Sequence, residues 1–486
     1  MTTVLDPETP SEPSDGPLVD SVPESVADPS PDGLAAEEPV GGVWSGRLLV
    51  PTLGIVLTVT LLAFEAMAVG TVMPVTARDL DGLSLYGWGF SATLIASLLT
   101  TVLAGGWVDR SGPGRPLLTG LGLFVAGLAA AGAAPTMWIF IGARMFQGLG
   151  TGVAMVAVYV LIARVYPEAL RPRVFAALSA AWVLPSLIGP AIGGLVAQHA
   201  GWRWVFLGLI PLVVPAAAML VPALRDVRPS EREAQRPAQR TTAVRYVAAV
   251  AVAGGAGVLL YGFQHPGVVM AIGVAIGLAG LGFGLPKMLP AGTLRFRRGL
   301  PSAVLVRGLL AGAFFGMDVF IPLALTSLHK FSPSEAGVVL TLGALGWSGA
   351  SQIQGRSERS RQFFVRLGSV LVTAGIVAAA VAVQFNGWAA APAWMVGGAG
   401  MGFAIGSLSV LVLNESPEEE QGVNSAALQI TDNLGSSLFV GAASAVVAAV
   451  GTDHLGSGLA ISGVLLSALA VVGILASLRL TPRHAT

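Results

Sequence analysis

Three acidic residues and one arginine lie inside long apolar stretches of this chain, where charged groups are rare. Glu65 is the only charged residue within residues 48–76, in LLAFEAMAVGTVMPV. Asp318 lies in GAFFGMDVFIPLAL, Asp432 lies in ALQITDNLGSS, and Arg144 opens RMFQGLGTG. Ionisable groups inside a membrane are costly and usually mark a proton or substrate pathway. These four residues are therefore the predicted site for proton coupling and substrate binding.

The apolar stretches around them predict an all-α polytopic membrane protein. Of the 486 residues, 54% are hydrophobic and only 11% are charged, against about 25% charged in soluble proteins. A helix needs about 20 apolar residues to cross a bilayer core of about 30 Å. Fourteen segments meet this requirement, near 48–75, 87–108, 116–134, 137–163, 174–198, 203–223, 244–262, 267–285, 301–325, 335–354, 364–384, 391–413, 423–449 and 456–478.

The charges between these spans predict the orientation of the chain. The alternate connections that include DRSGPGRP, RVYPEALRPR and QGRSERSRQFFVR are rich in arginine. The opposite connections contain only Arg78, Arg203 and Lys330 as basic residues. Basic loops stay on the cytoplasmic side, so we expect a multi-pass protein of the inner (plasma) membrane with both termini in the cytoplasm. The alternation requires the seventh and eighth spans to be both present or both absent.

Glu65 and Arg144 are predicted to lie at similar depths in the membrane. Glu65 lies about 15 Å, and Arg144 about 11 Å, from the outer end of its span at 1.5 Å per residue. Two interpretations remain open. The residues form a permanent ion pair between the first and fourth spans, or Glu65 takes up and releases a proton while Arg144 tunes its proton affinity.

Asp318 and Asp432 have no obvious basic partner at their depths. Each is therefore predicted to bind a proton or the substrate, because burial favours the neutral form of a carboxyl group. Hydrogen bonding to Asn433 and Gln429 is the structural alternative for Asp432. Arg307, near the inner end of its span, is expected to extend its guanidinium to the membrane surface.

Five segments are predicted. Residues 1–46 are acidic, contain no Lys or Arg before Gly46, and are expected to be a disordered cytoplasmic tail. Residues 47–225 and 301–480 are expected to form two six-helix bundles, and Glu65 with Pro74 and Asp318 with Pro322 suggest that the bundles are repeats. Residues 226–300 are a cytoplasmic linker with an inserted helix pair, and residues 481–486 are a second cytoplasmic tail.

Three backbone motifs follow one another in the first bundle. GGWVDRSGPGRP contains Gly105, Asp109, Arg110 and Gly112; RMFQGLGTG contains Gln147 and Gly148 after Arg144; and LIGPAIGG contains Gly189, Pro190, Gly193 and Gly194. In this order they resemble the major facilitator superfamily, and within it the fourteen-span drug:proton antiporters. The chain departs from the family at Pro113 and Gly114, where relatives carry two basic residues. The resemblance implies that the motif residues act in gating.

The resemblance also implies a function. We expect a proton-coupled exporter of amphipathic or cationic small molecules that works by alternating access, with membrane lipids around it, as a monomer. The alternatives are a transporter of the same fold for a lipid or metabolite, possibly without proton coupling, and a membrane sensor. The five histidines show no ligand spacing and cysteine is absent, so no metal, cofactor, nucleic-acid partner or enzymatic activity is predicted.

Overall fold

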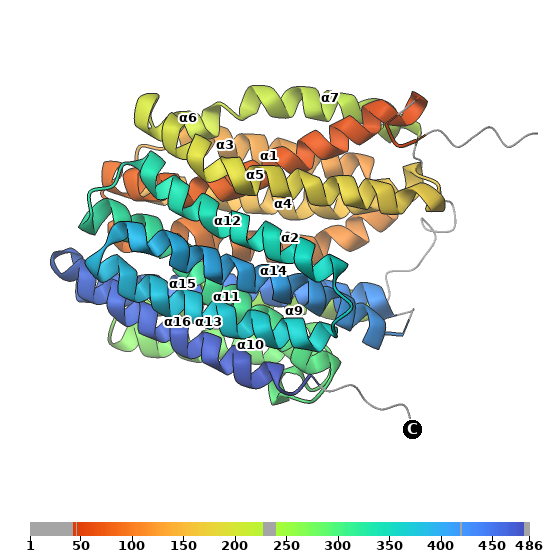
Figure 1. Ribbon diagram of the computed structural model, residues 1–486. Helices are drawn as coiled ribbons and strands as arrows, with labels where there is room; N and C mark the ends of the chain where they lie inside the picture. Colours follow the sequence, from red (N-terminus) through yellow and green to blue (C-terminus); the bar gives the residue numbers. More distant parts are fainter. Residues whose placement is uncertain (1–41, 45, 227–239, 418–419, 481–486) are drawn as a thin grey trace, which may run out of the picture. The chain divides into compact units, whose positions relative to one another are not determined.

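The computed structural model describes residues 42–44, 46–226, 240–417 and 420–480, and this part of the chain is helical throughout (Figure 1). Short 3-10 turns connect several of the helices. The helices are α1 (Leu49–Asp79), α2 (Trp88–Ser111), α3 (Gly114–Gly132), α4 (Met137–Val165), α5 (Arg171–His199), α6 (Arg203–Leu207), α7 (Ile210–Asp226), α9 (Arg240–Phe263), α10 (Val268–Met288), α11 (Leu300–Leu328), α12 (Pro333–Arg356), α13 (Arg361–Phe385), α14 (Ala390–Glu415), α15 (Gln421–Val450) and α16 (Leu455–Ser477).

Thirteen helical segments of the described residues are long and apolar enough to cross a membrane. They include α9 and α10, the predicted inserted pair, and a single segment formed by α6 and α7. The remaining predicted span, 335–354, lies in α12, which has sufficient length at 24 residues but is less apolar. The predicted tails, residues 1–46 and 481–486, lie almost entirely outside the described residues.

Small residues allow the helices to approach closely, which is the usual way in which helices pack in a membrane. A methyl group added to Gly150 of α4 would lie 2.5 Å from the carbonyl oxygen of Gly120 in α3. A methyl group added to Gly375 of α13 would lie 2.4 Å from the Cα of Gly397 in α14. Glycine at these positions therefore sets the spacing of the helices that carry the candidate site.

The helices form two groups of contacts and an inserted pair. Helices α1–α7 pack mainly on one another, as do α11–α16. Helices α9 and α10 pack together, and α9 contacts α2 and α15, which belong to different groups. The Nε1 of Trp88 on α2 also donates a hydrogen bond to Oε1 of Gln264, 2.9 Å away, at the end of α9. The inserted pair therefore lies along the junction between the two groups.

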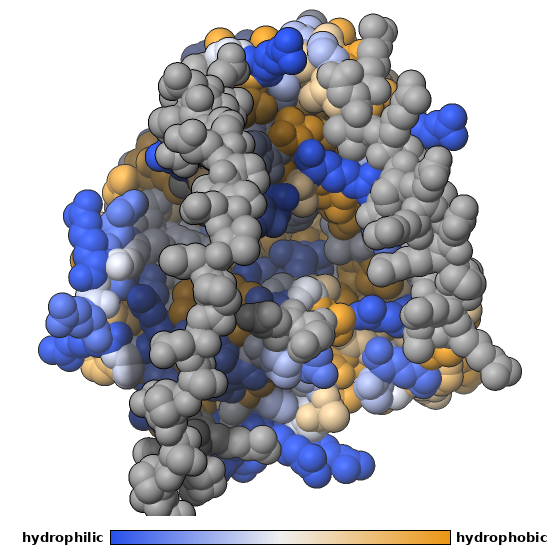
Figure 2. All heavy atoms as spheres, turned by 90° about the vertical axis from the view of Figure 1, so that its right-hand side faces the viewer, coloured by the Kyte–Doolittle hydropathy of each residue, from blue (hydrophilic) through white to orange (hydrophobic). Residues whose placement is uncertain are grey.

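The two groups meet chiefly at one end. We call this end the distal face, where α1 and α11 end and α2 and α12 begin, and the opposite end the terminal face. Polar contacts between the groups join Gly87 to Ser444 and Ser334 to Gln198, all close to the distal face. Figure 2 looks onto the terminal face, which is hollowed near its centre with hydrophilic residues inside the hollow. The described helices are thus closed together distally and separated towards the terminal face.

Candidate functional site

Glu65 and Arg144 form an ion pair in the interior of the first helix group, as their predicted depths suggested. Glu65 and Arg144 are each only 3% exposed. The Nη1 of Arg144 donates to Oε1 of Glu65, which joins α4 to α1. The predicted proximity of the two residues is therefore confirmed.

Arg144 makes two further hydrogen bonds. Its Nε donates to the carbonyl oxygen of Gly89 at 2.9 Å, and Nη1 also donates to Oε1 of Gln147 at 2.5 Å. Gln147 is fully buried, and its Nε2 has no hydrogen-bond partner. Gly148, beside it, packs so closely on α2 that an added methyl group would lie 2.2 Å from the carbonyl oxygen of Thr93. This motif therefore holds α1, α2 and α4 together around a buried charge.

Asp318 occupies a different environment in the second helix group. Among the described residues no basic side chain pairs with it, in agreement with the sequence prediction. Its Oδ1 instead accepts a hydrogen bond from Nε1 of Trp394 on α14, at 2.9 Å. The Trp394 ring stacks on Phe314, with centroids 4.4 Å apart, and Phe314 lies against Trp347 at 5.7 Å. Asp318 therefore lies beside a cluster of aromatic rings.

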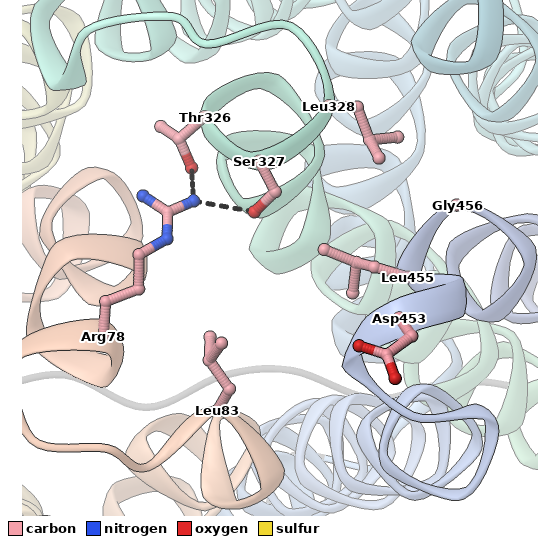
Figure 3. Close-up of a pocket in the computed structure, with 8 residues that line it drawn as sticks. All are labelled: Arg78, Leu83, Thr326, Ser327, Leu328, Asp453, Leu455 and Gly456. Carbon is pink, nitrogen blue, oxygen red and sulfur yellow. Dashed lines mark hydrogen bonds between the residues drawn. The ribbon is translucent and has the colours of Figure 1, made fainter.

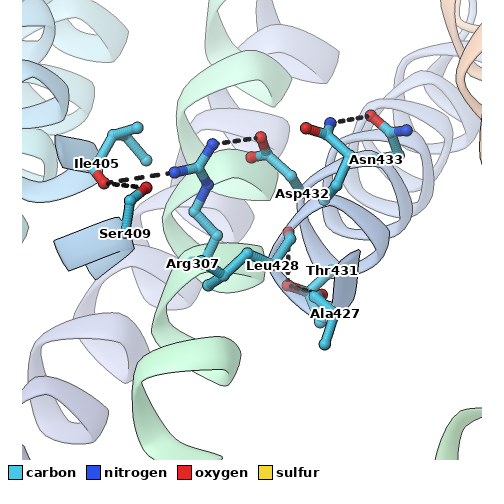
Figure 4. Close-up of polar contacts among 9 residues, drawn as sticks. Arg307, Ile405, Ser409, Ala427, Leu428, Thr431, Asp432 and Asn433 are labelled. Carbon is cyan, nitrogen blue, oxygen red and sulfur yellow. Dashed lines mark hydrogen bonds and ion pairs between the residues drawn. The ribbon is translucent and has the colours of Figure 1, made fainter. Parts of the chain in front are cut away.

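Asp432 has a basic partner, so the prediction that it lacks one is wrong. Its Oδ2 accepts from Nη2 of Arg307 at 2.8 Å (Figure 4). Arg307 also contacts the carbonyl oxygen of Ile405 on α14, so the expectation that it extends to the membrane surface is wrong too. Helices α11 and α15 cross closely where an added methyl on Gly308 would meet the Thr431 carbonyl oxygen at 2.9 Å. This close approach brings the long arginine side chain within reach of Asp432.

The Arg307–Asp432 pair is incompletely satisfied. The Nε of Arg307 and Oδ1 of Asp432 are buried without a hydrogen-bond partner, although the two side chains are 13% and 16% exposed. Figure 4 shows Asn433 turned away from the pair, where it accepts a hydrogen bond from Gln429. The structural alternative for Asp432, hydrogen bonding to these two neighbours, is therefore also not what the structure shows.

We expect Asp432→Asn to lower stability by about 1–3 kcal/mol, because it leaves a mostly buried guanidinium without its anion. Thermal unfolding of the purified protein, followed by tryptophan fluorescence, measures the change. The double variant Asp432→Asn with Arg307→Gln should recover part of the loss. An unaltered melting temperature in the single variant would show that the pair adds nothing to stability.

The motif of the fifth predicted span lies on α5, where some of its residues contact α1 and others contact α12. Gly189 and Gly193 face α1, where added methyl groups would lie 3.1 Å from Met67 Cβ and 2.9 Å from Ala68 Cβ. Gly194 faces α12, where an added methyl group would lie 2.5 Å from the carbonyl oxygen of Pro333. A methyl group on Gly337 of α12 would in turn lie 2.4 Å from the carbonyl oxygen of Pro190. The motif therefore joins the two helix groups near the distal face.

The motif after α2 lies at the terminal face. Gly112 follows the last residue of α2 with φ +74°, a left-handed conformation that favours glycine. Asp109 and Arg110 are exposed, and no atom outside the local helix lies within 4 Å of a methyl group added to Gly105. Only the role of Gly112, in ending α2, is explained by this local geometry.

Several contacts at the distal face involve residues that the sequence did not single out. Arg78 donates through Nη2 to Thr326 Oγ1 at 3.0 Å and to Ser327 Oγ at 2.7 Å. These residues line a pocket of about 400 Å³ into which Asp453 also faces (Figure 3). The hydroxyl of Tyr86 donates to the carbonyl oxygen of Val319 at 2.8 Å. These hydrogen bonds link α1, or the turn before α2, to α11, and ordinary polar residues at helix ends carry no sequence signal that would reveal them.

The GWRWVF segment after α5 has a structural role. Trp202 Nε1 and Arg203 Nη1 both donate to Oδ2 of Asp79, at 2.9 and 2.8 Å. The Arg203 guanidinium also lies 4.4 Å from the centre of the Trp202 ring. Together they tie the distal end of α1 to the start of α6. No group of three or more His, Cys, Asp or Glu side chains suited to a metal ion occurs among the residues that the structure describes.

Comparison with known proteins gives one consistent result. The sequence profile of the Major Facilitator Superfamily matches residues 55–440. The chain is 26% identical over 436 residues, 85% of its length and 90% of the relative's, to a probable multidrug-efflux transporter of Mycobacterium tuberculosis (strain H37Rv). It is 32% identical to the multidrug transporter protein MdtP of Bacillus subtilis (strain 168), over 38% of this chain and 34% of that one.

Solved structures agree on the fold. A D-xylose-proton symporter superposes with a TM-score of 0.64 at 17% identity, covering 90% of this chain and 98% of that one. A peptide transporter of the POT family superposes with a TM-score of 0.62 at 16% identity, covering 87% and 95%. The predicted fold, an all-helical membrane protein of this type, is therefore confirmed, and the chain belongs to the Major Facilitator Superfamily.

Proposed function

We propose that this protein is a proton-coupled exporter of amphipathic, often cationic, small molecules. The observation that carries this proposal is an acid on the first helix of each group: Glu65, which is buried, and Asp318, which is partly accessible. A carboxyl group inside an apolar region costs free energy of folding, so its presence on each of these helices indicates a functional role. The probable multidrug-efflux transporter named above supports the direction of transport.

The arrangement of the helices supports an alternating-access cycle. Contacts between the groups near the distal face would have to break for cargo to leave on that side, while the hollow at the terminal face would admit cargo from the other. The terminal-face connections carry most of the arginines, which is why we propose that this face is cytoplasmic. Binding on one side followed by rocking of the two groups is the usual way in which such folds move a solute.

The proton gradient would supply the energy. Each elementary charge that moves down a potential of 100 mV releases about 2.3 kcal/mol. For an uncharged cargo, this corresponds to about a fifty-fold concentration ratio, since every 1.4 kcal/mol is a factor of ten. For a monovalent cation exchanged for one proton, no net charge crosses the membrane, so the pH difference alone would drive export.

Uptake into inverted membrane vesicles tests this function. With the vesicle interior acidified, vesicles that contain the protein should accumulate cationic dyes, and collapsing the pH gradient with a protonophore should release them. Vesicles without the protein are the control. Uptake that is equal with and without the gradient would contradict proton coupling. Accumulation of lipids or metabolites but of no cation would favour a transporter of the same fold with another cargo.

A further inference from the structure

Glu65 and Asp318 have different partners, although they lie on corresponding helices of the two groups. Glu65 lies on α1 and its donor Arg144 on α4, the first and fourth helices of the first group. Asp318 lies on α11 and its donor Trp394 on α14, the first and fourth helices of the second group. We propose that Asp318, positioned by Trp394, exchanges a proton for a cationic cargo, while Glu65 stays ionised beside Arg144. This assignment rests on the function proposed above.

The chemistry of the donors distinguishes the two acids. A guanidinium is always charged, so protonating Glu65 would leave a buried cation without its anion, which is strongly unfavourable. The indole N–H of Trp394 is a neutral donor. It can hold a carboxylate oxygen of Asp318 whether the other oxygen is protonated or ionised. Protonation of Asp318 therefore leaves no buried cation without its anion.

Access to the two acids also differs. Glu65 is buried, whereas Asp318 is partly accessible, as are Phe315, one turn before it on α11, and Trp347 on α12. The rings of Phe315 and Trp347 lie 6.3 Å apart. A carboxylate on the same helix as such a partly accessible aromatic ring is suited to an organic cation, because ring faces attract positive charge and the carboxylate neutralises it.

The charged groups on the helices around Asp318 do not fix it in one protonation state. One titratable group close to Asp318 is Tyr86, whose hydroxyl donates to the carbonyl oxygen of the next residue, Val319. On α1 and α15 the charged groups level with the membrane interior, Glu65 and Asp432, have arginine partners. On α12, α13, α14 and α16, and at the distal ends of α1 and α11, the described charged residues and histidines lie at or near helix ends: Arg78, Asp79, His329, Glu335, Arg356, Arg361, Arg366, Glu415, Asp453 and His454.

The proposed exchange conserves charge and atoms. The O–H bond of neutral Asp318 breaks, the proton passes to solvent, and the carboxylate that remains pairs with the incoming monovalent cation. In the reverse step a proton from the other side binds the carboxylate and the cation leaves. One proton thus replaces one positive charge.

Binding of tetraphenylphosphonium to the purified protein tests the assignment. Calorimetric titrations in buffers of different ionisation enthalpy measure both the affinity and the protons released. For the parent protein, we expect tighter binding as pH rises and release of up to one proton in the pH range where Asp318 is neutral. For Asp318→Asn, we expect binding at least about tenfold weaker, independent of pH, with no proton released, since a charged partner is worth about 1.5–3 kcal/mol.

Trp394→Phe keeps an aromatic ring on Phe314 and removes only the N–H donor. We expect it to bind tetraphenylphosphonium, but with half-maximal binding moved to higher pH, because the donor that favours the ionised carboxylate is gone. This variant keeps the test decisive if Asp318→Asn does not fold. Asp81→Asn, the same change at an exposed turn of the distal face, is the matched control and should behave as the parent.

Two results would overturn the assignment. One is proton release by Asp318→Asn equal to that of the parent, and the other is a pH profile of Trp394→Phe that matches the parent. Either would leave the proposed function intact if the parent still accumulates cations in acidified vesicles. Absence of any proton-linked transport by the parent would instead contradict the proposed function itself.

Discussion

Glu65→Gln is expected to destabilise the protein more than the double replacement Glu65→Gln with Arg144→Gln. Removing one partner of a buried ion pair leaves the other charge uncompensated, at a cost of about 3–5 kcal/mol. Removing both leaves two neutral amides that can bond to each other. Thermal unfolding of the parent, both single variants and the double variant completes the double-mutant cycle.

A matched comparison is available at the surface. Glu168 pairs with Arg171 at 3.4 Å, and the Glu168 side chain is 88% exposed. Glu168→Gln should leave the melting temperature nearly unchanged, because exposed ion pairs add little to stability. If Glu65→Gln were as harmless as Glu168→Gln, the account of Glu65 as a permanently paired charge would be wrong.

A reversible cross-link between α5 and α12 at the distal face is expected to stop transport completely. The side chains of Gln198 and Ser334 meet there, with Oε1 and Oγ 2.6 Å apart, close to the packing of Gly194 on Pro333. Because the chain contains no cysteine, Gln198→Cys with Ser334→Cys introduces the only two thiols. Oxidation should lock the distal contacts, and reduction should restore transport.

Controls for the cross-link use the same protein. The double variant before oxidation, and each single cysteine variant after oxidation, should transport at the parent rate. Full transport by the cross-linked protein, with the disulfide verified by mass spectrometry, would contradict the proposal that α5 and α12 separate during the cycle.

Depth along the helices was the most useful quantity that the sequence offered. It predicted that Glu65 and Arg144 can meet, because they lie at similar distances from the outer ends of the first and fourth spans. The same counting places Arg307 nearer to its helix end than Asp432, so a pair between them was not expected. It failed there because an arginine side chain is long enough to reach inwards as well as to the surface, and because α11 and α15 approach closely at Gly308.

The partner of Asp318 could not be found by searching for opposite charges. Trp394 is neutral, and tryptophan in a membrane helix usually serves in packing. The internal repeat indicates where the partner lies, since the fourth helix of each group supplies the hydrogen-bond donor to the acid on the first helix. That signal becomes usable only when the two groups are compared residue by residue, and the sequence similarity between them is too weak for this alone.

Hydropathy predicts which segments span the membrane, but it does not predict which helices pack against each other. The segments 244–262 and 267–285 were predicted as an inserted pair, and the structure has α9 and α10 there. The placement of α9 against α2 and α15 depends on side-chain packing and on the hydrogen bond from Trp88 to Gln264, which a hydropathy pattern does not encode. Residues 335–354 illustrate the opposite case: α12 is less apolar than the other long helices, yet it packs between α5 and α14.

We propose that cargo moves in exchange for protons at Asp318, and simultaneous measurement of the cation and proton fluxes in proteoliposomes tests this exchange. With tetraphenylphosphonium inside liposomes of the parent protein, an acidic exterior should drive its efflux together with proton entry. One proton per monovalent cation makes the exchange electroneutral, so a difference of one pH unit should support a gradient of up to about tenfold. Asp318→Asn should show neither flux. Cation efflux from the parent without proton entry, or undiminished coupled fluxes in Asp318→Asn, would contradict the account.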